Sequence, residues 1–190
     1  MIRFPLRPAL AAVFCLAFVA SALATADERT FTIASGGYKL VAPEGWQRVQ
    51  PKSNMVETEF SIAPAAEGQP AGRMTVMGAG GSVQANIDRW YGQFSQPDGS
   101  STKEKSTTKS LKLAGCNVTL VDIPGTYKDM PMGPFAQGKA VERPAYRMLA
   151  AIVETPDAGN YFLKFYGPAE CLSKHADGFR GMVEGLAANK

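Results

Sequence analysis

The stretch that decides the fold is residues 146–186, YRMLAAIVETPDAGNYFLKFYGPAECLSKHADGFRGMVEGL. It predicts a strand over Arg147–Glu154, a tight turn, a second strand over Tyr161–Tyr166 and, after Gly167 and Pro168, a closing helix. In the first strand, apolar side chains point to both faces, so both faces of the sheet must be covered there. We therefore predict that this strand lies in the middle of a mostly antiparallel sheet.

The closing helix has an apolar side and a separate stripe of glycines. The apolar side consists of Leu172, His175, Phe179, Met182, Val183 and Leu186. A lone histidine on such a side is more often a hydrogen-bonded packing residue than a catalyst, so we expect His175 to pack against the sheet. The stripe consists of Gly178, Gly181 and Gly185. Because glycine costs a helix about 1 kcal/mol relative to alanine, we expect another segment to approach this stripe closely.

Residues 1–26 have the pattern of an export signal. Arg3 and Arg7 give it a basic start, Ala9–Ala20 is apolar, and Ala24–Ala26 offers a small-residue cleavage site. The apolar run is shorter than the roughly 20 residues that a permanent membrane helix needs. We therefore expect a cleaved signal and a mature protein that is periplasmic or secreted, without a permanent membrane span.

The remainder, residues 27–190, has the length of one globular domain with its own core. Without the signal the chain keeps 18 basic and 17 acidic residues, a net charge of about +1. A nucleic-acid binder normally carries a clustered basic surface, so this balance argues against nucleic acid as a partner. Cys15 belongs to the signal, and because Phe14 precedes it where a lipoprotein signal has a small residue, we expect no lipid anchor.

Two cysteines remain after export, Cys116 and Cys171. Disulfides persist in exported proteins, and a bridge closing this loop of about 55 residues would contribute roughly 4 kcal/mol. Their spacing matches no redox or zinc motif. We predict that Cys116 and Cys171 form a disulfide, with two unpaired thiols as the alternative.

Residues Met55–Ile62 alternate between apolar and polar side chains, which predicts a half-exposed strand. Glu57 and Glu59 share its polar face at roughly 7 Å, a separation within the range of about 5 to 9.5 Å that glycoside hydrolases use. The simpler interpretation is that both carboxylates face water. Earlier in the chain, Thr30–Ile33 and Tyr38–Val41 predict a hairpin, followed by Trp46 as a core anchor.

The segment Arg73–Ser95 predicts a strand, a glycine loop and a helix that begins at Ser82. This order resembles a phosphate-binding loop, in which free backbone N–H groups and a helix N-terminus face the anion. However, Val83 stands where the dinucleotide motif has its third glycine, and the loop has no phosphate-binding lysine. The alternative is a connector capped by Ser82 before a helix whose aromatic side packs in the core.

Three lysines, Lys103, Lys105 and Lys109, alternate in a polar segment. If they belong to a strand, they mark an edge that is protected against pairing with another chain. The alternative is a surface for an anionic partner.

A long connector over Asp129–Arg143 contains Met130, Met132 and Phe135. Long connectors are often functional, and methionine adapts well at binding surfaces, so we expect these three residues to contact a partner. Two thioethers could also bind Cu(I), but the chain has a single histidine and no methionine-rich tract. We therefore expect no metal and no cofactor.

Two stretches, Tyr38–Trp46 (YKLVAPEGW) and Tyr161–Pro168 (YFLKFYGP), together with the mid-chain helix and the long hairpin, resemble the PsbP-like superfamily. This superfamily also includes the DcrB-like envelope proteins and a Ran-binding nuclear transport factor. The resemblance implies an α+β fold in which an antiparallel sheet has helices on both faces, an α-β-α sandwich. It also implies binding or assembly factors, most without demonstrated chemistry. The photosystem members act with manganese and calcium, and nothing in this sequence matches a site for those ions.

The leading functional hypothesis is a non-enzymatic binding or assembly protein of the cell envelope, with a protein partner held by the Met130 connector and one sheet edge. The first alternative is a small hydrolase that uses Glu57 and Glu59, or His175. This alternative has few candidate catalytic residues, because the sequence lacks the Gly-x-Ser-x-Gly motif that would present a nucleophile to His175. The second alternative is a protein that binds a small ligand or copper through the glycine loop or the methionines.

Overall fold

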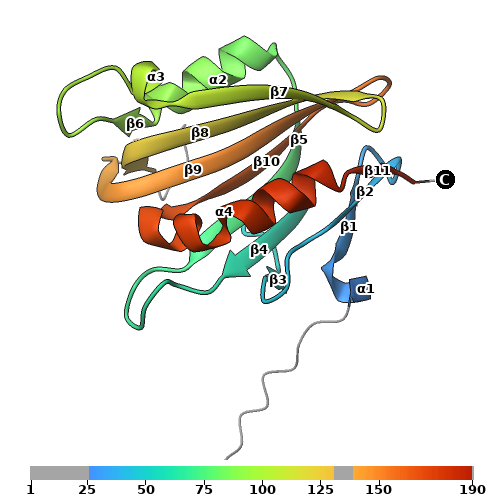
Figure 1. Cartoon of the computed structure of the whole chain (residues 1–190), viewed down its shortest axis with the longest axis horizontal. Helices are drawn as coiled ribbons and strands as arrows, with labels where there is room; N and C mark the ends of the chain where they lie inside the picture. Colours follow the sequence, from blue (N-terminus) through green and yellow to red (C-terminus); the bar gives the residue numbers. More distant parts are fainter. Residues whose placement is uncertain (1–25, 131–138, 190) are drawn as a thin grey trace, which may run out of the picture.

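The computed structural model describes residues 26–130 and 139–189. Its strands include Gln47–Val49 (β3), Thr58–Ile62 (β4), Gly72–Ala79 (β5), Phe94–Ser95 (β6), Thr107–Leu113 (β7), Cys116–Asp129 (β8), Val141–Thr155 (β9) and Gly159–Pro168 (β10). These strands form one antiparallel sheet in the described part of the chain, in the order β3, β4, β5, β10, β9, β8, β6, with β7 also paired to β8 (Figure 1). The prediction of an α+β fold with a mostly antiparallel sheet is confirmed.

The helices lie on both sides of this sheet. They span Ala26–Arg29 (α1), Val83–Gly92 (α2), Thr102–Lys105 (α3) and Ala169–Glu184 (α4). In Figure 1, α2 and α3 lie on one side and α4 on the other. A smaller sheet is made of the predicted hairpin, Thr30–Ile33 (β1) and Tyr38–Val41 (β2), with Ala187–Ala188 (β11) paired to β2. None of the helices in the described ranges is long and apolar enough to span a membrane.

The hairpin of β9 and β10 lies in the middle of the sheet, as the sequence predicts. β9 pairs with β10 on one side and with β8 on the other, and its residues 148–153 are all buried. β9 is longer than the predicted strand, with 15 residues, and it pairs along β8, which has 14. The additional N-terminal end of β9 is mostly polar, so the apolar alternation used for prediction stops before the backbone pairing does.

The larger hydrophobic cluster lies between the sheet and α4. Trp46 is buried in it, 5.0 Å from Phe165 between ring centroids, which confirms its predicted role as a core anchor. The predicted close approach to the glycine stripe occurs at Gly178, where a Cβ atom would lie 3.2 Å from Pro43. At Gly181 the same Cβ would meet nothing within 4 Å, so only part of the stripe is explained by packing.

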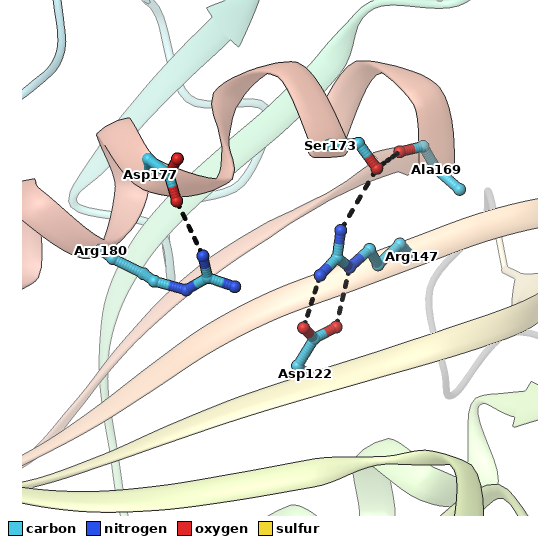
Figure 2. A network of polar contacts seen from close by, with 6 residues as sticks. All are labelled: Asp122, Arg147, Ala169, Ser173, Asp177 and Arg180. Carbon is cyan, nitrogen blue, oxygen red and sulfur yellow. Dashed lines mark hydrogen bonds and ion pairs between the residues drawn. The ribbon is translucent and has the colours of Figure 1, made fainter.

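A polar network ties α4 to the sheet (Figure 2). Arg147 on β9 donates two hydrogen bonds to Asp122 on β8, from Nε at 2.8 Å and from Nη2 at 2.6 Å. Its Nη1 donates to Ser173 Oγ on α4 at 3.3 Å. The carboxylate raises the pKa of the Arg147 guanidinium, because its hydrogen bonds favour the charged form. One arginine therefore connects two strands and the covering helix.

The two cysteines do not form the predicted disulfide. Both thiols are free and buried. Cys116 begins β8, at the end of the sheet where β9 turns into β10, whereas Cys171 Sγ lies at the opposite end and donates to the carbonyl oxygen of Ala63 at 3.3 Å. The strand register separates these ends by some seven residues, about 23 Å at 3.3 Å per residue. A disulfide needs Cα atoms within about 7 Å, so the prediction is wrong for this fold.

Two of the three alternating lysines are not in a strand. Lys103 and Lys105 belong to the short helix α3, where Lys105 Nζ lies 2.9 Å from Asp98 Oδ2. Lys109 is exposed on β7, an outer strand of the sheet. The edge prediction therefore applies to Lys109 alone.

Candidate functional site

Three tyrosines from neighbouring strands converge on the α2 side of the sheet, beyond the end of that helix. They are Tyr127 on β8, Tyr146 on β9 and Tyr166 on β10. The rings of Tyr127 and Tyr146 stack at 6.2 Å and 9°, and Tyr127 lies 5.5 Å from Tyr166. α2 has only 10 residues, about 15 Å, so it is too short to cover the full length of the strands. The tyrosines occupy the part that it leaves open.

A β-bulge in β8 helps to place Tyr127. The pairing of β8 with β9 shifts between Gly125 and Tyr127. Gly125 has φ +141°, and a Cβ atom there would lie 2.7 Å from the carbonyl oxygen of Ser95. Glycine is therefore required at this close approach, and the bulge re-aims the side chains that follow it.

The tyrosines line a concavity of about 520 Å³, which we call the tyrosine cleft. Arg73, Asp129, Met130, Arg143 and Lys52 also line it. A second concavity of about 420 Å³ adjoins it and shares Tyr127 and Met130. Among the described residues, no hydrogen bond involves the hydroxyl group of Tyr127 or Tyr146. Burial raises the pKa of Tyr127, so its hydroxyl stays protonated and available as a donor.

Arg73 is held in the cleft by Glu59 and Tyr166. Its Nε and Nη2 atoms each donate to the Glu59 carboxylate at 2.7 Å, and Nη1 donates to the hydroxyl oxygen of Tyr166. Hydrogen bonding to Arg73 lowers the pKa of Glu59. The Glu59 side chain is only 2% exposed, which corrects the prediction that it faces water. The strand pattern alone could not show this, because the compensating cation comes from the neighbouring strand β5.

The carboxylate pair proposed from the sequence is not a pair in the structure. Glu57 lies before β4, and its Oε1 accepts a hydrogen bond from the backbone N–H of Gly78 at 3.3 Å. Glu59 is engaged by Arg73 and by the backbone N–H of Lys52 at 3.3 Å. Glu57 is exposed and Glu59 is held in an ion pair, so the two carboxylates are not arranged as an acid and a base on either side of one bond.

Lys164 on β10 lies beside the cleft, between two aromatic rings. Its Nζ is 5.4 Å from the centroid of Trp90 and 5.9 Å from that of Tyr166. The Nζ donates to Gln93 Oε1 at 3.4 Å, and no carboxylate of a described residue lies within 4.0 Å of it. Burial, with smaller contributions from Arg89 and Arg73, lowers the pKa of Lys164 to about 8.

Met130 is 49% exposed and lies at the rim of both concavities, which fits the predicted contact role. Met132 and Phe135, the other two predicted contact residues, lie outside the described residues. Within residues 26–130 and 139–189, no group of three or more His, Cys, Asp or Glu side chains could hold a metal ion.

His175 lies on the other side of the sheet, far from the cleft. Its Nδ1 accepts a long hydrogen bond of 3.4 Å from the indole N–H of Trp46, and the two rings meet edge to face. Burial lowers the pKa of His175, so it is neutral at pH 7. Its described partner is a core aromatic residue, which agrees with a packing role.

The glycine loop before α2 is closed by asparagine side chains. Ser82 Oγ accepts from the backbone N–H of Ala85 at 3.2 Å, which confirms the predicted cap. Asn86 Nδ2 donates to the carbonyl oxygens of Gly80 and Ser82, and Asn160 Nδ2 donates to that of Gly81. These contacts fix the loop as a connector between β5 and α2.

Apart from Met130, the residues of the tyrosine cleft were not identified from the sequence. One signal was available: Lys164 and Tyr166 alternate with Leu163 and Phe165 in a strand predicted to lie inside the sheet. A lysine in a strand with two covered faces needs a compensating environment. The convergence of Tyr127 and Tyr146 depends on the bulge and the register, which the sequence pattern does not contain.

Neither a family model nor a curated protein sequence matches this chain. Among solved structures, the chain is similar to cyanobacterial PsbP (CyanoP) from Synechocystis sp. PCC 6803, with a TM-score of 0.50 and 10% identity over 93% of this chain and 98% of that one. PA94 from Pseudomonas aeruginosa has a TM-score of 0.45 at 10% identity, covering 85% of this chain and 96% of that one. LpqN from Mycobacterium tuberculosis, which is involved in cell envelope biogenesis, has a TM-score of 0.43 at 12% identity, covering 80% and 83%. The likeness to PsbP shows the fold, and the predicted PsbP-like fold is confirmed.

Proposed function

We propose that this protein is a non-enzymatic binding protein that holds a segment of a protein partner in the tyrosine cleft. The observation that carries the proposal is the convergence of Tyr127, Tyr146 and Tyr166 with the exposed Met130 at one open concavity. Export to the cell envelope is the compartment that the sequence predicts, and we place the partner there.

The composition of the cleft is that of an interaction site. Tyrosine, methionine and arginine are enriched in protein interfaces, and tyrosine and arginine often dominate their binding energy. Tyr127 and Tyr146 present hydroxyl groups that no described residue engages, so they can donate to a partner's carbonyl groups. Their stacked rings lose little conformational freedom on binding, because each is already held by its neighbour.

The hydrolase alternative has less support. Nucleophilic catalysis needs a base in contact with a nucleophile, whereas His175 contacts Trp46 and faces away from the cleft. Glu59 is bound by Arg73 and is not a free base.

The sheet-edge part of the binding hypothesis stays a prediction, and the exposed lysine Lys109 on β7 disfavours strand pairing at that edge.

The proposal is tested by site-specific crosslinking in the cells that produce the protein. A photoreactive phenylalanine analogue replaces Met130 in one variant and Met55 in the control. Met55 is 66% exposed but does not line the cleft, so it reports random collisions. We expect a discrete protein adduct from position 130 and none from position 55.

A further variant shows whether the adduct depends on the cleft. Tyr146→Ala in the protein with the photoreactive residue at position 130 removes one side of the stacked tyrosine pair. We expect this change to reduce the adduct at least fivefold. Equal adducts from positions 130 and 55, or the absence of an adduct at 130, would refute the proposal.

A further inference from the structure

The two adjoining concavities are surrounded by an excess of positive charge. Five cationic side chains line them, namely Lys52, Arg73, Arg89, Lys128 and Arg143, with one acidic residue of the described chain, Asp129. Behind the lining, Lys164 contacts Gln93 and Glu59 contacts Arg73. This excess is local, because the whole chain carries a formal net charge of only +3. A concave surface with one dominant sign attracts ligands of the opposite sign.

Only two of these cations form an ion pair within 4.0 Å in the described part of the chain, and Lys128 lies opposite Glu142 in the β8–β9 ladder. Arg73 pairs with Glu59 at 2.7 Å, and Arg143 Nη2 lies 3.2 Å from Asp129 Oδ2. The other four have no carboxylate of a described residue within 4.0 Å. Arg89 Nη2 donates to the amide oxygen of Asn86 at 2.5 Å, and this acceptor is neutral.

Lys164 is the most constrained of the four. It lies between Trp90 and Tyr166, and its hydrogen-bond acceptor, Gln93 Oε1, is neutral. Gln93 lines one concavity and Tyr166 lines the other, so the ammonium group contacts the lining of both, directly behind these two side chains. A half-buried cation without a carboxylate is costly, and an incoming carboxylate would offset that cost.

The groups that face Lys164 come from four elements. They are Arg89 on α2, Arg73 on β5, Tyr166 on β10 and, next to Tyr166, Tyr127 on β8. Burial raises the pKa of both tyrosines, so they stay protonated above their usual range. An arginine side chain does not lose its proton in proteins. Lys164 is therefore the group of this set that changes charge near pH 8.

We propose that the partner segment bound in the tyrosine cleft is acidic and that Lys164 receives one of its carboxylates. This inference rests on the proposed binding function and specifies the chemistry of the partner. The tyrosines contact the backbone and apolar atoms of the segment, while Lys164, Lys52 and Lys128 neutralise its charges. The long-range part of the attraction weakens with salt, because exposed lysines at the rim are screened.

The test measures binding of a named probe by fluorescence anisotropy. The probe is a fluorescein-labelled peptide of about twelve residues in which glutamate alternates with threonine, and its control has glutamine in place of glutamate. We expect the glutamate peptide to bind at least tenfold more tightly at low salt. Heparin, an anionic polysaccharide, competes as a separate arm, and tighter binding of heparin than of the peptide would overturn the inference.

Substitutions of Lys164 test whether its ammonium group binds a carboxylate of the peptide. We expect Lys164→Met to weaken binding of the glutamate peptide about tenfold and Lys164→Arg to preserve it. The matched control Lys109→Met, on the exposed outer strand β7, should leave binding unchanged. The Lys164→Met protein should fold normally, because methionine fills the site without a buried charge. Lys52→Ala with Lys128→Ala, both at the rim, provides a second variant with an expected fivefold loss.

The pH dependence separates Lys164 from a general charge effect. In the wild type, binding of the glutamate peptide should fall as pH rises through about 8, where the pKa of free Lys164 lies. Lys164→Arg should abolish this fall, because arginine stays charged. Unchanged binding in Lys164→Met, or the same pH profile in Lys164→Arg, would overturn the inference.

The two proposals fail in different ways. An adduct at position 130 that persists in high salt and in Lys164→Met would keep the binding function and refute an acidic partner. Loss of the adduct at position 130 in every condition would refute the binding function, whatever the peptide measurements show.

Discussion

Glu59 and Arg73 show how a neighbouring strand decides the chemistry of a side chain. By its position in an alternating strand, Glu59 belongs to the polar face. In the structure Arg73 bonds to both of its carboxylate oxygens, and the ion pair is buried on the carboxylate side. A carboxylate that is paired when folded and solvated when unfolded links stability to pH.

We predict that Glu59 makes the protein sensitive to acid. Hydrogen bonds from Arg73 hold the pKa of Glu59 below its ordinary value, so its contribution is complete above that ordinary value and is lost as pH falls through the folded pKa. Glu59→Gln should lower the free energy of unfolding at pH 7 by roughly 2 kcal/mol and flatten this acid dependence. Urea unfolding between neutral and acidic pH measures both effects.

The control for this prediction is Glu57→Gln. Glu57 is the neighbouring carboxylate of the sequence pattern, and it is exposed with one long hydrogen bond from Gly78. We expect this variant to follow the wild type within about 0.5 kcal/mol. Parallel curves for Glu59→Gln and the wild type across the acid range would contradict the assigned role.

At the scale of elements, α4 is joined to the sheet by polar contacts as well as by its apolar side. The Asp122–Arg147 pair is bidentate, its side chains are 23% and 21% exposed, and Arg147 also reaches Ser173 on α4 (Figure 2). The same figure contains a second arginine–aspartate pair, Arg180 with Asp177 at 2.9 Å, within the helix itself. The two pairs differ in exposure and in what they connect.

We predict a measurable coupling for the first pair and almost none for the second. A double-mutant cycle with Asp122→Asn and Arg147→Met should give a coupling energy of about 1 to 2 kcal/mol in thermal or urea unfolding. The matched cycle with Asp177→Asn and Arg180→Met should give a coupling near zero, because Asp177 is 97% exposed. Equal couplings in the two cycles would show that the contact between Arg147 and α4 does not depend on the Asp122–Arg147 ion pair.

The elements that could be predicted from the sequence are those with a repeating apolar pattern. β9, β10 and α4 were predicted because their side chains alternate or repeat at helical spacing over many residues. The N-terminal end of β9 was missed, since its backbone pairing with β8 continues where the side chains turn polar. The candidate site lies in this extension. Tyr127 and Tyr146 become neighbours only through the register after Gly125, which no local pattern specifies.

At the scale of the whole molecule, the two cysteines should report global unfolding. Cys116 and Cys171 are both fully buried, and burial raises the pKa of the Cys171 thiol, which further slows its reaction. We predict that a Cys15→Ser protein shows almost no reaction with Ellman's reagent when native and two reactive thiols in concentrated guanidinium. Ser110→Cys, on the exposed strand β7, is the control that should react at once.

The same thiol measurement also tests whether Cys116 and Cys171 form a disulfide. If the denatured Cys15→Ser protein yields two thiols only after a reductant is added, the cysteines were bridged and the arrangement of free thiols at opposite ends of the sheet is wrong. Two thiols without a reductant agree with the structure.

Among the described residues, the sheet separates two unequal hydrophobic clusters, 24 buried residues on the α4 side and nine on the α2 side. Most of their burial therefore lies on the side away from the tyrosine cleft. The residues of the cleft are separated from the larger cluster by the backbone of the sheet. Selection can therefore change these residues with little loss of the ability to fold. Among related proteins with this division, sequence changes would concentrate on the cleft side of the sheet. Such proteins would keep the same backbone while the ligands that they bind change.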